Sequence, residues 1–514
     1  GVATDKGTSV TDEPTMAVYS RLQQTFILIS LTFASALPTL NVTVGNAVLP
    51  QMRGDLSAGL EEISWVLTAT MVCTAIAMPT AGWLGMRFSQ RRALIVCITA
   101  FTFASAMLGI ADTLEEVVFW RACQGLFGGP ISPLCIPVIL STYPKRDHGM
   151  AMALWAGGVM LSPIMGPPLG GYLTSIYDWH LTYAFMVPLG IITYFLVVGA
   201  VPDSRRHTDL RFDWLGFLAL SVALPATQIM VDRGTRLDWF ESQEITAWAI
   251  IAVCTFYFFL AHSLTTRQPF VDFRIFRDKN FVIGSTCLLV SGVLTFAPLI
   301  LLPTLLGDLR GVPVETIGFM LMPRGIGFVL GTFVLGRLIR VLDPRMMLAF
   351  GFLIEAVAFW YMTTFDLTIG LQEVFVAGVV LGTGEAVMWT PVAAITFSTL
   401  APHLRAHGSA IFQFGRFFAS GMGVSAAVIV LSRSTQSNHA TLTEFVPPFS
   451  EVLRSGDFAA FWNISGLEGL ARLDGEMTRQ ATMIGYINDF WLLMMLMLAV
   501  MPLILFLDRP GSSE

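Results

Sequence analysis

The hydrophobic positions of this chain form long, nearly uninterrupted runs rather than the narrow apolar stripes of soluble surface helices. A run of about 20 apolar residues is long enough to cross the hydrocarbon core of a bilayer as a helix. The pattern therefore predicts an all-α membrane protein, in which the longer spans tilt or extend beyond the membrane. The fourteen predicted spans are residues 24–49, 62–84, 93–112, 114–142, 149–175, 181–201, 213–231, 244–263, 279–306, 315–339, 346–365, 371–399, 407–432 and 487–508.

One connection is much longer than the others. Residues 433–486 form the only sizeable polar segment between spans. They contain Pro447 and Pro448, followed by two amphipathic stretches at about 449–461 and 467–484. We interpret this segment as an outer loop. It either docks a partner on the outer side or forms a folded cap or a mobile loop, and the sequence favours the second alternative.

The composition agrees with the membrane assignment and excludes other classes. Of the 514 residues, 54% are hydrophobic and 13% are charged, and the mean hydropathy is +0.68. A soluble globular protein carries more charge than this. The net charge of -6 therefore says little about partners. No basic patch interleaved with exposed aromatic residues supports nucleic-acid binding, and residues 1–20 lack the apolar core of a signal peptide.

The cysteines and histidines give no sign of a metal or disulfide site. All six cysteines fall inside apolar spans, where packing is their expected role: Cys73, Cys97, Cys123, Cys135, Cys254 and Cys287. No His or carboxylate cluster has the spacing of metal ligands, so no metal and no bound cofactor is expected.

Lys and Arg residues concentrate in the connections on one side of the predicted bundle. Examples are Arg91 and Arg92 between the second and third spans, and Lys145 and Arg146 between the fourth and fifth. Positive residues mark the cytoplasmic side of a membrane protein. With fourteen spans, this bias places both termini in the cytoplasm.

Residues 158–171, in the fifth span, combine small residues with prolines. The small residues recur every fourth position, which on a helix is one face that a neighbouring helix can approach to backbone contact. The prolines interrupt the hydrogen-bond ladder and should bend the helix. The stretch is either a static packing seam or a sliding contact; its residues of interest are Gly158, Ser162, Pro163, Gly166, Pro167, Pro168, Gly170 and Gly171.

Three further stretches, together with residues 158–171, resemble the signatures of the major facilitator superfamily. They are residues 40–50, residues 82–92 and residues 121–130, the last of which includes Gln124 and Gly125. The fourteen-span drug:proton antiporter family of the EmrB/QacA type fits best. Residues 228–240 resemble the EmrB-like members in particular.

The resemblance implies a fold and a function. It implies a cytoplasmic tail (1–23), two six-helix bundles (24–201 and 279–508), and two transmembrane helices inserted between them (213–263). A central cavity would open alternately to either side. The implied activity is export of hydrophobic or amphipathic drugs and toxic compounds from a bacterial inner membrane, driven by the proton gradient. A Gram-negative host would add a periplasmic adaptor and an outer-membrane channel as partners.

Two alternatives stay open at this stage. The same fold could export one specific metabolite, siderophore or fatty acid, which a polar and selective cavity would favour. A membrane enzyme or a transport-dead sensor is the other alternative. Against it, the sequence shows no nucleophile or metal constellation at the ends of the spans and no nucleotide-binding loop.

One departure from the family pattern bears on proton coupling. The first-span motif of the family usually carries an acid at the position of Asn41. An amide cannot titrate, so a proton has to be carried elsewhere. Arg121 lies at a similar depth in the fourth span, and the resemblance connects this arginine with proton transfer. An arginine stays protonated, so it would act by tuning a neighbouring acid.

Five ionisable residues lie well inside spans, where each costs at least about 2.5–3.5 kcal/mol to insert. They are Arg121, Arg324, Glu355, Glu385 and Arg416. We predict that Glu385, between Gly384 and a proline further along the span, binds the proton or a cationic substrate group. The alternative is a Glu that is satisfied by a helix neighbour. We predict an ion pair between Glu355 and Arg416, which lie at a similar depth in the inner half, and place Arg324 in the outer half. Glu355 is also a candidate for proton coupling. Asp489 is expected at the outer membrane interface.

The aromatic residues supply the remaining candidates for the cavity wall. Soft aromatic and Met surfaces accept varied hydrophobic ligands. Most such residues in a membrane bundle serve packing instead, and the sequence does not separate the two roles. Together with Asn41, Arg324 and Arg416, the candidates are Trp155, Phe296, Trp389, Phe412 and Phe414.

Overall fold

The computed structural model describes residues 19–57, 60–203, 211–234, 237–338, 342–445 and 466–508. Within these ranges the chain is helical and contains no strand. The predicted all-α membrane fold is therefore confirmed. Most of the predicted N-terminal tail and the amphipathic stretch at 449–461 lie outside the described residues.

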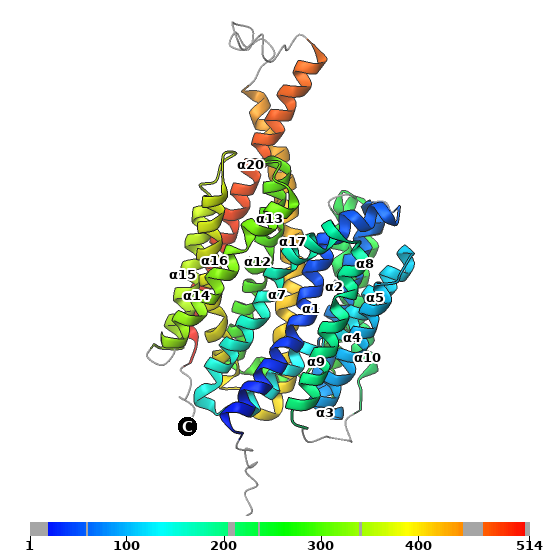
Figure 1. Ribbon diagram of the computed structural model, residues 1–514, viewed down its shortest axis with the longest axis vertical. Coiled ribbons are helices and arrows are strands. Elements are labelled where there is room, and N and C mark those ends of the chain that lie inside the picture. The colour runs from blue at the N-terminus through cyan, green and yellow to red at the C-terminus, as the bar shows by residue number, and fades with distance from the viewer. Residues whose placement is uncertain are drawn as a thin grey trace, which may run out of the picture.

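The N-terminal half forms one bundle of helices (Figure 1). Local signals set several helix ends. The hydroxyl of Ser20 accepts from the backbone N–H of Gln23, whose side chain accepts from Ser20 in turn, and this capping box starts the first helix. The helices are α1 (Arg21–Asp55), α2 (Leu60–Ala77), α3 (Thr80–Phe88), α4 (Gln90–Leu108), α5 (Leu114–Gly128), α6 (Ile131–Thr142), α7 (His148–Ile176), α8 (Trp179–Ala184) and α9 (Met186–Ala200).

Two helices and a second bundle follow. Of the two helices that come first, α10 packs against α2 and α17, and α11 packs against α10. The second bundle contains breaks at Pro323 and after Thr304, where a π-helical turn ends the first of its helices. The helices are α10 (Trp214–Gly234) and α11 (Gln243–Thr265), then α12 (Lys279–Thr304), α13 (Val314–Leu321), α14 (Pro323–Leu338), α15 (Pro344–Met362), α16 (Leu371–Ser398), α17 (Arg405–Glu444) and α20 (Leu467–Val500).

The number of spans agrees with the sequence pattern. Thirteen segments of the described chain are long and apolar enough to cross a membrane, and the bent pair α2–α3 makes fourteen when it is taken as one span. The pair bends by 54°. The bend falls at Pro79, which precedes α3 and cannot donate to the helical ladder.

The described residues of the predicted outer loop are mostly helical, and the amphipathic stretch predicted at 467–484 is one of these helical parts. Residues 433–444 continue α17 and residues 467–486 belong to α20. The two helices project together beyond the rest of the bundle (Figure 1). His439 pairs with Asp474 at 3.0 Å, and Asn488 donates to Ser434 at 2.7 Å. Hydropathy falls after residue 432, but α17 continues because no proline or glycine occurs between residues 433 and 446.

The small-residue face of α7 packs closely against α1. A Cβ on Gly158 would overlap Thr32, and a Cβ on Gly166 would lie 2.6 Å from Cβ of Thr43 and 3.1 Å from the backbone nitrogen of Val44. The close approach predicted from the spacing is therefore present. Despite its prolines, α7 is one unbroken helix, so the prolines do not divide the span.

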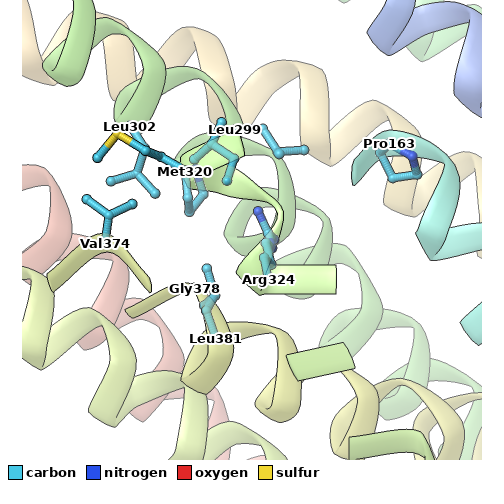
Figure 2. Close-up of a pocket in the computed structure, with 10 residues that line it drawn as sticks. Pro163, Leu299, Leu302, Met320, Arg324, Val374, Gly378 and Leu381 are labelled. Carbon is cyan, nitrogen blue, oxygen red and sulfur yellow. The ribbon is translucent and has the colours of Figure 1, made fainter. Parts of the chain in front are cut away.

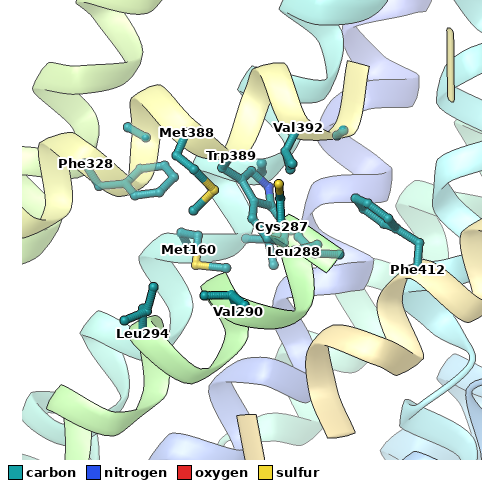
Figure 3. Packing of buried hydrophobic residues seen from close by; sticks show 14 of the residues in the cluster. Met160, Cys287, Leu288, Val290, Leu294, Phe328, Met388, Trp389, Val392 and Phe412 are labelled. Atoms are coloured by element: carbon teal, nitrogen blue, oxygen red, sulfur yellow. The ribbon is translucent and has the colours of Figure 1, made fainter. Parts of the chain in front are cut away.

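The two halves contact each other along two seams. On one side α7 packs against α13, α14 and α16, and on the other α17 packs against α3 and α6. At the second seam, Ser409 donates to the carbonyl oxygen of Pro133 at 3.0 Å. One hydrophobic core continues through both halves (Figure 3), and it joins Met160 of α7 to Phe328 and Met388.

The α1–α7 seam yields a first prediction. Gly166→Val should lower the stability by about 1–3 kcal/mol, because the added side chain meets Thr43 and the backbone of Val44. Gly171→Val is the matched control on the same helix, since nothing lies within 4 Å of a Cβ there. The measurement is the midpoint of thermal unfolding in detergent. Equal midpoints for the two variants would contradict the proposed packing.

Candidate functional site

A cavity lies between the two halves, near the middle of the bundle. Its empty space is about 570 Å³, part of which is open to solvent. Most of the wall comes from α1, α2, α4, α5 and α6, and the remainder comes from α12 and α17. The lining residues are Pro38, Thr39, Asn41, Val42, Thr70, Thr74, Met78, Phe101, Gln124, Gly128, Gly129, Ser132, Phe296, Arg416 and Phe417.

A chain of neutral polar groups forms the N-terminal wall. The amide of Asn41 donates to Oε1 of Gln124 at 3.0 Å, and Gln124 donates to the hydroxyl of Ser105 at 2.8 Å. Arg121 reaches the same Gln124 oxygen at 3.4 Å. The structure therefore brings Asn41 and Arg121 to one network, at the similar depth expected from the sequence, with Gln124 between them.

Arg121 is fully buried behind this wall. Its guanidinium lies 5.3 Å from the centre of the Tyr183 ring, which is a cation–π distance. A side chain on Gly45 would overlap the guanidinium, so the glycine makes room for it. No acidic side chain pairs with Arg121 among the described residues. The ring and the amide oxygen are the groups that stabilise its charge.

Arg416 contributes the positive charge of the cavity wall itself. Its guanidinium lies 5.0 Å from the centre of the Trp389 ring, and its Nε has no hydrogen-bond partner in the described part of the chain. The predicted Glu355–Arg416 ion pair is wrong. The similar depth suggested by the sequence is not enough, because α15 and α17 are not neighbours in the bundle and α16 and α20 lie against α15 instead.

Glu385 pairs with Arg324, an arrangement that depth estimates did not reveal. Nε of Arg324 donates to Oε2 of Glu385 at 2.9 Å, Nη2 donates to the other carboxylate oxygen, and Nη2 also reaches the carbonyl oxygen of Thr295 at 2.8 Å. Both residues are buried. A two-point pair of this kind fixes the orientation of both side chains.

Glycines bring α14 and α16 close enough for this pair. A Cβ on Gly382 would overlap the carbonyl oxygen of Arg324, and one on Gly331 would lie 2.8 Å from Ala386. Small residues spaced by four allow membrane helices to approach in this way. The contact places Arg324 directly opposite Glu385, one turn further along α16 than Gly382.

Glu355 lies beside the pair. It is 1% exposed, and its Oε1 has no hydrogen-bond partner within the described ranges. A Cβ on Gly384 would lie 2.6 Å from Cγ of Glu355. The side chain of Glu355 therefore occupies the space that a side chain at position 384, next to Glu385, would fill. The structure thus assembles two carboxyls and one guanidinium in the C-terminal half.

A second pocket lies against Arg324 (Figure 2), and its empty space is about 440 Å³, part of which is open to solvent. Leu299, Met320 and Val374 give it an apolar wall, and Pro163 of α7 reaches it from the N-terminal half. Arg324 is the charged residue of this wall. Arg324 is at the first turn of α14, directly after the break at Pro323.

The predicted aromatic lining is placed only in part. Phe296 faces the cavity, as do Asn41 and Arg416. Trp155 and Phe412 are buried in the core instead, and Trp155 donates to Ser35 at 3.2 Å. Trp389 lies beneath Arg416, and Phe414 stacks on Phe418 next to the inserted helices. In a membrane bundle all faces of a helix are apolar, so the sequence does not show which face meets the cavity.

Several polar residues of the wall were not predicted. Thr70 and Thr74 of α2 face the cavity one turn apart, and Ser132 opens α6. Their spacing of four in an apolar span was the available signal. Asp489 is 1% exposed, and neither carboxylate oxygen has a partner in the described chain.

The arrangement can bind and move small molecules, and its described residues include no group of three or more metal-ligating side chains. Two helical bundles enclosing a central cavity, with buried charges beside it, define a membrane transport protein. Residues 31–424 match the sequence model of the Major Facilitator Superfamily. The chain belongs to this superfamily and is a multi-pass transporter, not an enzyme.

Individual relatives cover nearly the whole chain. The multidrug export protein EmrB of Escherichia coli (strain K12) is 31% identical over 96% of both chains. EmrB of Haemophilus influenzae is 30% identical over 95% of this chain and 96% of that protein. The fatty acid resistance protein FarB of Neisseria gonorrhoeae is 28% identical over 94% of this chain and 96% of that protein.

Solved structures support the fold. A bacterial homologue of the human lysosomal transporter Spinster, in an inward-facing and occupied conformation, gives a TM-score of 0.54 at 15% identity over 95% of this chain and 97% of that chain. The human organic anion transporter MFSD10 gives 0.59 at 11% identity over 92% of this chain and 99% of that chain.

The Arg324–Glu385 pair yields a second prediction. Glu385→Gln should destabilise the protein by about 3–5 kcal/mol, because it leaves the buried Arg324 without a counter-charge. Adding Arg324→Gln to it should restore part of the loss, as measured by thermal unfolding in detergent.

The half-buried pair of Asp343 and Arg345 at the N-terminal end of α15 is the control. The same amide substitutions there should change the stability by at most about 1 kcal/mol. Additive losses in the Glu385→Gln and Arg324→Gln cycle would show that the buried pair does not act as a unit.

Proposed function

We propose that this protein is a proton-coupled efflux transporter that exports hydrophobic or amphipathic compounds by alternating access. The observation that carries the proposal is the cavity between the halves, with walls from both bundles and buried charges next to it. Relatives named as multidrug export and fatty acid resistance proteins, similar along almost their full length, support it. Rocking of the halves about the cavity would expose it to each side in turn.

We place the transporter in a bacterial inner membrane with both termini in the cytoplasm. Arg91, Arg92 and Arg146 lie in connections on one side, as the positive-inside rule requires for the cytoplasm. The first residues of α1 and the end of the last helix lie at that same end of the bundle (Figure 1). The proton gradient is the energy source, and no bound cofactor is part of the proposal.

The projecting ends of α17 and α20 are where we propose that a periplasmic adaptor docks, with an outer-membrane channel beyond it, in a Gram-negative host. They extend past the other helices on the outer side, and Phe445 and Leu467 at their tips are exposed. A photo-crosslinking residue at Leu470 should capture the adaptor, whereas one at the exposed Phe240, on the same side but on the inserted pair, should not.

Export of an amphipathic anion, such as a fatty acid, is the second candidate that a specific observation favours. The cavity wall carries the guanidinium of Arg416 and the amides of Asn41 and Gln124, and no Asp or Glu is among its described lining residues. A buried cation with a free N–H attracts an anionic group. An apolar tail would lie against Phe101, Phe296 and Phe417.

Transport by inverted membrane vesicles tests the proposed function. Anilinonaphthalene sulfonate, a permanently anionic amphipathic dye, should accumulate in vesicles with an acidic interior, and a protonophore should abolish its accumulation. Vesicles from cells that lack the protein are the control. If the dye accumulates equally in the control vesicles, or if the protonophore has no effect, the proposal of proton-coupled export fails.

The charge of Arg416 yields a third prediction. Arg416→Gln should weaken the apparent affinity for this dye by about tenfold or more, which corresponds to a lost charge-assisted hydrogen bond of about 1.5–3 kcal/mol. Affinity for the permanently cationic dye ethidium should stay equal or rise. Arg405→Gln, at the inner end of the same helix, is the matched control and should change neither. Weaker binding of both dyes would indicate a structural role for Arg416.

A further inference from the structure

The C-terminal bundle contains a buried group of three ionisable residues, Glu355, Glu385 and Arg324. All three side chains are buried, with exposed fractions of 1%, 4% and 6%. The proposed function requires a residue that binds and releases protons, and Asn41 on the opposite half cannot do so. The question is which of the two carboxyls in the group carries the exchangeable proton.

The hydrogen bonds distinguish the two carboxyls. Both oxygens of Glu385 accept from the guanidinium of Arg324, an arrangement in which a proton on Glu385 would displace one of the N–H donors. Glu355 has an oxygen with no partner among the described residues. A proton on Glu355 breaks no hydrogen bond, and a proton on Glu385 breaks one of the two.

The balance of charge points the same way. The group holds two carboxyls and one guanidinium, so it is neutral only when it holds one proton. A buried net charge is costly in a membrane, whereas a neutral group is tolerated. We propose that Glu355 carries this proton in the present conformation and exchanges it during transport, while Glu385 stays ionised as the partner of Arg324.

Other charged groups near α15 do not change this balance. The helix packs against α16, α20 and the short C-terminal turn at Met501–Phe506. Arg345 on α15 itself binds Asp343 and the carbonyl oxygen of Leu507 at the inner end. Glu373 on α16 caps its own helix at the outer end.

Two charged residues that lie farther from Glu355, Asp489 and Arg416, do not change this balance either. Asp489 of α20 is buried, but the charges that act on Glu355 are those of Glu385 and Arg324. Arg416 acts on Glu385 from a distance, yet it lies over Trp389 and pairs with neither carboxyl.

Arg324, the cation of this group, is connected to the cavity wall. Arg324 donates to the carbonyl oxygen of Thr295 on α12, and the next residue, Phe296, lines the cavity. When the O–H bond of Glu355 breaks and the proton leaves toward the cytoplasm, Arg324 has two carboxylates to bind instead of one. The carbonyl oxygen of Thr295 then competes with a second carboxylate for the N–H groups of Arg324. The protonation state of Glu355 is thereby linked to the position of α12.

The inference rests on the proposed function, and the experiment separates the two. Purified protein is reconstituted into liposomes, and anilinonaphthalene sulfonate is followed in two assays. The first is uphill accumulation driven by a pH gradient. The second is exchange of internal for external dye without a gradient, which requires alternating access but no net movement of protons.

Glu355→Gln imitates the protonated residue and should lose at least tenfold in gradient-driven accumulation while it keeps dye exchange. Dye exchange by this variant should also become independent of pH. Glu355→Asp retains a carboxyl and should recover part of the driven accumulation. Asp489→Asn removes another buried carboxyl that lies outside the group, and this matched control should keep both activities.

Three results would overturn the inference. The first is driven accumulation by Glu355→Gln at the wild-type level. The second is loss of both dye exchange and driven accumulation in both Glu355 variants. The third is loss of driven accumulation in Asp489→Asn while Glu355→Gln loses no driven accumulation. The proposed function fails separately, if the wild-type protein itself shows exchange but no accumulation in response to the gradient.

Discussion

The structure depends on how charge is accommodated inside a membrane. A guanidinium or carboxylate in the hydrocarbon core is expensive unless it is paired, hydrogen-bonded or neutralised. Arg324 and Glu385 meet this requirement with a two-point ion pair between α14 and α16. Glycines on both helices allow the backbone approach that the pair needs. The third group, Glu355, fits beside the pair because Gly384 leaves room for it.

Under the proposed mechanism, the two halves of the molecule divide the work of binding and coupling. The N-terminal half supplies most of the cavity wall through Asn41, Gln124 and a set of hydroxyls, and its buried cation, Arg121, lies beneath an aromatic ring. The C-terminal half supplies Arg416 to the wall and holds the carboxyls. Under the proposed mechanism, substrate and proton therefore occupy different halves, and α12 connects them through Thr295 and Phe296.

The fold was largely predictable because long apolar runs and proline or glycine positions report directly on membrane helices. The fourteen spans and the close face of α7 at Gly158 and Gly166 followed from such patterns. Helix ends outside the membrane did not, since α17 and α20 continue where hydropathy falls.

The site was less predictable than the fold. The sequence singled out Glu355, Glu385, Arg324 and Arg416 as buried charges, but it paired them wrongly. Depth along a span says how far a residue lies from the membrane surface, and it does not say which neighbouring helix it faces. The neighbours of α15 are α16 and α20, and Arg416 lies on neither. Most of the predicted aromatic positions failed for a related reason, because apolar side chains surround every helix of the bundle; Phe296 does line the cavity.

The central claim is that one proton resides on Glu355 and is released when the transporter moves substrate. Infrared difference spectroscopy of the purified protein measures this directly, since a protonated carboxylic acid has a carbonyl stretch that a carboxylate lacks. Addition of an amphipathic anion should remove one such band, and the loss should be absent in Glu355→Gln. An unchanged band in the wild-type protein, or the same loss of the band in the variant, would contradict the account.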